Sequence, residues 1–104
     1  MSELKLITCI VERGKAERVV KEILKLTSGG VTSFYARGTG IREKIGFIGK
    51  FIEPEKEVIM TVVPEDKASE VFEKITEIAK LREPGKGMAY MHSIEKASGM
   101  LKRD

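Results

Sequence analysis

The single cysteine, Cys9, and the single histidine, His92, are the residues best suited to nucleophilic or metal chemistry. They fall in segments that we expect to be neighbouring strands, so a Cys–His nucleophile pair or half of a metal site is one interpretation. The interpretation we favour is a buried thiol and an incidental histidine. No CxxC or HExxH motif occurs, and the carboxylates fall on helix faces expected to be solvated. We therefore predict no catalytic residue, no metal site and no enzymatic activity.

Two short glycine loops could bind an anion. Gly38-Thr39-Gly40 follows an expected strand, and Gly85-Lys86-Gly87 precedes another. Glycine lets backbone amides approach an anion, and the Lys86 ammonium could add a charged contact. Either loop alone is more simply a turn. If the two loops meet, on adjacent strands of one sheet or across a subunit boundary, they form an anion site. Its predicted residues are Thr32, Gly38, Gly40, Arg42, Gly85, Lys86 and Gly87.

The segment between residues 41 and 54 combines cations with aromatic residues. Its basic residues are Arg42, Lys44 and Lys50, and its aromatic residues are Phe47 and Phe51. Irregular segments of this length in a small domain often carry function, and aromatic residues beside cations suit partner binding. The alternative is that both phenylalanines fold the segment back or extend the flanking strands. We favour partner binding.

Composition limits the remaining possibilities. The chain has 104 residues, and we expect one domain over 1–104. Its net charge is +3, from 19 Lys and Arg against 16 Asp and Glu, and the signs alternate without a basic block, so no nucleic-acid partner is expected. One cysteine excludes an intrachain disulfide and fits a reducing cytoplasm. No run approaches the roughly 20 apolar residues that span a bilayer. Met1 to Leu6 carries charges where a secretory signal needs an apolar run, so we expect no such signal here.

Hydrophobic periodicity predicts six elements. Helical spacing marks two of them, and runs of β-branched and aromatic residues mark four strands. We expect Gly29 and Gly30 to end the first helix, and Asp66 to cap the second. The predicted strands are 4–11, 31–37, 57–63 and 88–93, and the predicted helices are 15–27 and 67–81.

This order predicts an α+β fold, a ferredoxin-like βαββαβ sandwich in which an antiparallel sheet carries two helices on one face. The other face of the sheet is then bare. We expect Cys9, Met60 and Met91 to supply apolar groups there, and we expect that face to be covered by further copies of the chain.

Three segments together resemble the PII family of nitrogen regulatory signalling proteins, over about 4–97. Gly30-Val31-Thr32-Ser33 to Arg37-Gly38-Thr39-Gly40 is similar to the family's second strand and its V-x-G-x-G segment. Thr61-Val62-Val63-Pro64-Glu65-Asp66 is similar to its I-V-V-P-D-D segment. Pro84-Gly85-Lys86-Gly87-Met88-Ala89-Tyr90 resembles its nucleotide loop, G-D-G-K-I-F.

The resemblance implies a homotrimer with nucleotide sites in the clefts between subunits. Family members bind ATP or ADP there, often with 2-oxoglutarate and Mg²⁺. The segment between the second and third strands, here 41–54, would dock on a regulated protein such as a transporter or an enzyme. No cofactor is fixed by this resemblance, and ADP, AMP and ATP are the candidate ligands beside other small anions.

Several positions depart from the family pattern. Residues 41–54 lack the tyrosine that is modified in the longer family loop, and Ile41 and Arg42 stand where the family has a basic residue and a glutamine. Lys86 replaces an aspartate and Met88 a phosphate-binding lysine. Gly99 and Leu101 align with two family arginines, with Lys102 and Arg103 close by. These changes argue against ordinary ATP and 2-oxoglutarate binding. The alternative function is a ferredoxin-like oligomer that binds a metal or serves as a structural interaction module.

Overall fold

The computed structural model describes residues 3–38 and 55–99. The order of elements is βαββαβ, as predicted, and each predicted strand and helix is present with small differences at its ends. The elements are β1 (Leu4–Glu12), α1 (Ala16–Leu26), β2 (Val31–Arg37), β3 (Glu55–Pro64), α3 (Glu65–Ile78) and β4 (Gly87–Ile94).

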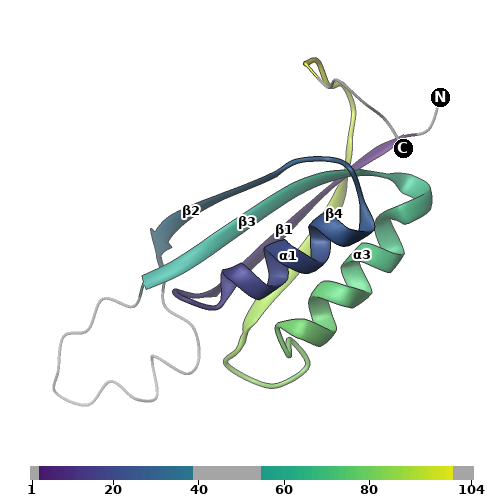
Figure 1. Ribbon diagram of the computed structural model, residues 1–104. Coiled ribbons are helices and arrows are strands. Elements are labelled where there is room, and N and C mark those ends of the chain that lie inside the picture. Colours follow the sequence, from purple (N-terminus) through teal and green to yellow (C-terminus); the bar gives the residue numbers. More distant parts are fainter. Residues whose placement is uncertain (1–2, 39–54, 100–104) are drawn as a thin grey trace, which may run out of the picture.

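The four strands form one antiparallel sheet in the order β2-β3-β1-β4. β1 and β3 are therefore central, and β2 and β4 are the two edges. Both helices lie side by side on one face of the sheet (Figure 1). The ferredoxin-like fold class is confirmed.

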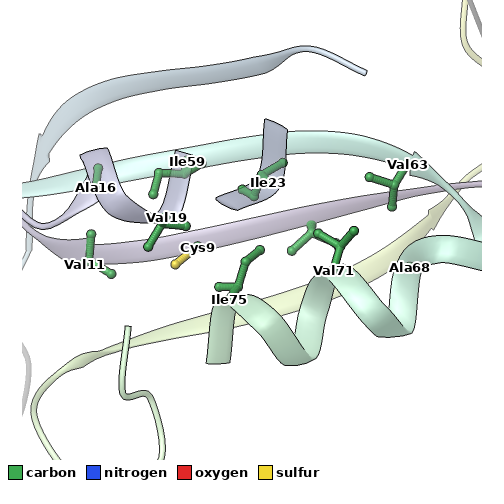
Figure 2. Close-up of a cluster of buried hydrophobic side chains, with 11 residues drawn as sticks. Cys9, Val11, Ala16, Val19, Ile23, Ile59, Val63, Ala68, Val71 and Ile75 are labelled. Carbon is green, nitrogen blue, oxygen red and sulfur yellow. The ribbon is translucent and has the colours of Figure 1, made fainter. Parts of the chain in front are cut away.

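The hydrophobic core lies between the sheet and the two helices (Figure 2). Alternate residues of the central strands point into it, as the two-residue period of a strand requires. Cys9 is among them and is fully buried beside Val19 and Ile75. The expectation that Cys9 lies on the bare face is therefore wrong. The core residues are Ile7, Cys9, Val11, Ala16, Val19, Ile23, Ile59, Val63, Ala68, Val71 and Ile75.

The opposite face of the sheet is apolar too, and no described helix or strand packs on it. Strand register places Phe34, Val58, Ile10 and Met88 in one row across all four strands. Phe34 is 46% exposed and Met88 is 56% exposed. Met60 belongs to this open face, as predicted, whereas Met91 pairs with Ile7 and shares the helix-covered face. The open face is thus real, although two of its three predicted members are wrong.

The helix ends also differ from the predictions. α3 begins directly after Pro64, so Asp66 lies in its first turn and makes no capping hydrogen bond. There its carboxylate is favourable to the helix dipole instead. α1 ends before Gly29, and the Gly29 amide donates to Thr27 Oγ1 at 3.2 Å. A Cβ at Gly29 would lie 2.9 Å from the Val62 carbonyl oxygen, so the close approach of β3 favours glycine here.

Over the described part of the chain, no helix is long and apolar enough to cross a membrane.

Two neighbouring positions of α1 test where the core lies. Ile23 is 1% exposed and Leu24 is 54% exposed. We expect Ile23→Ala to lower the free energy of unfolding by about 2–5 kcal/mol, because it removes buried methyl groups and leaves a cavity. Leu24→Ala should change it by less than about 0.5 kcal/mol. Urea unfolding at one protein concentration measures both. Equal losses would contradict the orientation of α1.

Candidate functional site

The loop that leads into β4 needs glycine because of its φ angles and its close approach to β1. Gly85 and Gly87 have φ angles of +80° and +135°, which side-chain-bearing residues rarely adopt. A Cβ at Gly87 would lie 2.3 Å from the carbonyl oxygen of Ile10 on β1. No side chain fits there while β4 stays paired with β1. The fold alone therefore requires Gly87.

Lys86 stands between these two glycines and is half-buried. The chain reaches it through a turn after α3, in which the Leu81 amide donates to the Thr76 carbonyl at 3.0 Å and the Glu83 amide to the Lys80 carbonyl at 3.0 Å. No carboxylate within the described ranges pairs with the Lys86 ammonium. An unpaired, half-buried cation beside flexible amides is suited to an anion.

Gly38 follows β2 and, unlike Gly87, is not required by the backbone conformation. Its φ angle lies outside the left-handed region, and a Cβ there would lie 3.8 Å from Lys56 Cγ, which is ordinary contact. The backbone of this chain therefore does not require glycine at position 38. A bound group that approaches the backbone closely would require it.

Gly38 and Gly87 lie at the same end of the sheet but at opposite edges. Register aligns Tyr35 of β2, Glu57 of β3, Val11 of β1 and Gly87 of β4 in one row. Three strand spacings of about 4.8 Å separate the two edges, or roughly 14 Å. The possibility that the loops meet on adjacent strands is therefore wrong. A meeting across a subunit boundary stays a prediction.

The remaining predicted site residues divide into two groups. Thr32 is exposed and projects from the open face of β2, in a row with Met60, Thr8 and Tyr90. It lies further from the sheet end than Gly38. The other predicted residues fall outside the described residues, and these are Gly40, Arg42, Lys44, Phe47, Lys50 and Phe51.

A polar cluster at this sheet end was not anticipated from the sequence. The Arg13 guanidinium forms an ion pair with Glu55 and lies 4.8 Å from the centre of the Tyr35 ring. The hydrogen bond to Glu55 raises the pKa of Arg13. The Gly14 amide donates to Glu57 Oε1 at 3.1 Å. These contacts join the turn after β1 to the end of β2 and the start of β3. Only the strand register could have revealed them.

Cys9 and His92 cannot act as a pair. They lie on neighbouring strands, as predicted, but Cys9 pairs with Ala89 and His92 with Leu6. Cys9 faces the helices, whereas His92 lies on the exposed open face. Burial raises the pKa of the Cys9 thiol from 9.0 to about 11, which disfavours the reactive thiolate. Among the described residues no group of three or more potential metal ligands occurs.

Comparison with known proteins gives one consistent result. Residues 4–102 match the family model described as nitrogen regulatory protein P-II. The chain is also similar to the crystal structure of Arabidopsis thaliana PII bound to citrate, at 26% identity and a TM-score of 0.67. That match covers 89% of this chain and 78% of the Arabidopsis chain. No curated protein matches the sequence.

The buried thiol gives a testable dependence of stability on pH. Because the pKa of Cys9 is about 11 in the folded chain and 9.0 without burial, the folded state holds the proton more tightly. The protonated Cys9 thiol therefore makes its full contribution to the free energy of unfolding below pH 9. That contribution, about 2–3 kcal/mol, is lost as the pH rises from 9 to 11. In Cys9→Ala this contribution should be absent. Urea unfolding from pH 8 to 11 measures the difference, and identical slopes in both proteins would contradict it.

Proposed function

Because this chain belongs to the nitrogen regulatory protein P-II family, we propose that it is a trimeric regulator whose ligand sites lie between subunits. Proteins of this family regulate partner proteins and form trimers. In this proposal the single domain is not an enzyme. It senses a small anion or nucleotide and passes the signal to a regulated protein, such as a transporter or an enzyme, through 41–54.

One observation carries the proposal. Gly38 and Gly87 share an end of the sheet, yet the whole width of the sheet separates them. A small anion is shorter than the roughly 14 Å that separates Gly38 from Gly87 of the same chain, so we propose that it contacts loops of two different chains. It can contact both if the β2 edge of one subunit lies beside the β4 edge of another.

The open face of the sheet supports the assembly. A continuous apolar row across four strands is costly to leave in water, at roughly 25 cal/mol for each Å². Further copies of the chain would remove it from solvent while leaving the helices outside. Such packing also brings sheet edges of different subunits close together, as the ligand site requires.

The chemistry of the two loops supports an anionic ligand. Lys86 supplies a charge, and the glycine-rich backbone supplies amide donors. The Arabidopsis relative is bound to citrate, a small polyanion. Met88 stands where the family pattern has a phosphate-binding lysine, so ADP or AMP fits this site better than ATP does.

The Arg13 cluster supports a signalling role for 41–54. Arg13 holds Glu55, the first described residue after that segment, and contacts Tyr35 near the end of β2. Arg42, Lys44, Phe47, Lys50 and Phe51 remain the proposed partner contacts. Arg13 thus links the two strands that flank 41–54, close to Gly38. In this proposal a ligand that binds at the glycine loops could change the conformation of 41–54 through these contacts.

The assembly predicts a measurable mass. Light scattering at micromolar concentration should give three times the chain mass of 11.6 kDa. Phe34→Glu should shift the protein towards monomer, because it places a charge on the open face. Leu24→Glu is the matched control, since Leu24 is similarly exposed but lies on α1. A wild-type monomer, or equal dissociation in both variants, would contradict the proposed interface.

The ligand site predicts a specific role for Lys86. Lys86→Ala should weaken binding of ADP about tenfold to a hundredfold, because a charge-assisted contact contributes roughly 1.5–3 kcal/mol. Isothermal titration calorimetry measures the affinity, and circular dichroism checks that the fold is intact.

Lys5→Ala is the control for this experiment, because Lys5 lies near the opposite end of β1 and binds Ser93 Oγ at 2.8 Å. ATP should bind no more tightly than ADP. Tight, Mg²⁺-dependent ATP binding that survives Lys86→Ala would show that the site lies elsewhere.

A further inference from the structure

The outer surface of the two helices contains a basic groove. It lies between α1 and α3 and has a volume of about 390 Å³. α1 and α3 lie on the side of the sheet away from the open face (Figure 1), so the proposed assembly leaves the groove accessible. Its lining residues are Arg18, Lys21, Glu22, Lys25, Lys74 and Ile78.

Helical spacing gathers the positive charge. Arg18, Lys21 and Lys25 are three and four residues apart, so they follow one side of α1. Lys74 faces them from α3. Glu22 is the only acidic lining residue, and it binds Lys25 at 3.0 Å. The groove therefore carries four cations and one anion.

Two of these four cations form no ion pair within the described part of the chain. Lys25 lies in the last turn of α1, where a cation is favoured by the helix dipole, and it also pairs with Glu22. Lys21 lies 4.0 Å from Glu17. Arg18 and Lys74, by contrast, form no ion pair with any residue in the described ranges. Cations held near one another across two helices repel, and an external anion would relieve that repulsion.

The groove fits an extended anion. Arg18 and Lys25 are seven residues apart, which is roughly 10 Å along a helix. A guanidinium and several ammonium groups in a line match successive phosphates. Among the described residues no aromatic side chain lines the groove and Ile78 is the single apolar lining residue, so these residues offer nothing for a base to stack on. An oligonucleotide is therefore less suited to it than a bare phosphate chain.

We propose that the α1–α3 groove is a second anion site, which binds an unbranched chain of phosphate groups without a base. This site is independent of the proposed site at the glycine loops. It uses none of the same residues, and it needs no neighbouring subunit.

Calorimetry with inorganic tripolyphosphate at low salt tests the proposal. Arg18→Ala and Lys74→Ala should each weaken binding roughly tenfold. Glu22→Gln should strengthen it by about threefold, because it removes the one opposing charge. The matched controls are Arg82→Ala and Lys5→Ala, which remove cations outside the groove and should change the affinity less than about twofold.

The same titration separates the two sites. Tripolyphosphate binding at the groove should survive Lys86→Ala, whether or not the glycine loops bind a nucleotide. Loss of binding in Lys86→Ala, or equal losses in the groove and control variants, would overturn the proposal. A single-stranded oligonucleotide that binds more tightly than tripolyphosphate, with the same dependence on Arg18, would replace the phosphate chain with nucleic acid as the ligand.

Discussion

The structure depends on one imbalance: the sheet is apolar on both faces, and the two helices cover only one. Cys9, Ile59 and Val71 close the covered side into a core with almost no exposed surface. On the other side Phe34, Val58, Ile10 and Met88 remain in a row. A chain of this length has no further described element to place there. The exposed row therefore favours association with other copies.

The same topology explains why the proposed ligand site needs loops from two chains. Placing β1 and β3 in the centre sends β2 and β4 to opposite edges while their glycine loops stay at one end. Association through the open face is what could join a loop of one subunit to a loop of another. In the proposed assembly the helices lie outside, which leaves the basic groove between α1 and α3 accessible.

The sequence was sufficient to predict the order of elements, because helical and strand periods are properties of neighbouring residues. It misassigned Cys9 because β1 is apolar at most positions, so alternation could not separate its two faces. It misassigned Met91 because the face of that residue follows from the register of β4 against β1, which pairs Met91 with Ile7. It placed a cap at Asp66, whereas Pro64 ends β3 and starts α3 without one. The Arg13 cluster and the α1–α3 groove join residues far apart in the chain, and only tertiary packing defines them.

Complementation between two defective subunits tests the shared site most directly. Gly38→Asp would place an opposing charge at one loop, and Lys86→Ala would remove the cation from the other. Each variant alone should bind ADP poorly. After dissociation and reassembly of an equal mixture, about a quarter of the sites should combine two intact loops and bind with wild-type affinity. If subunit exchange is complete and no such sites appear, the ligand site does not lie between subunits.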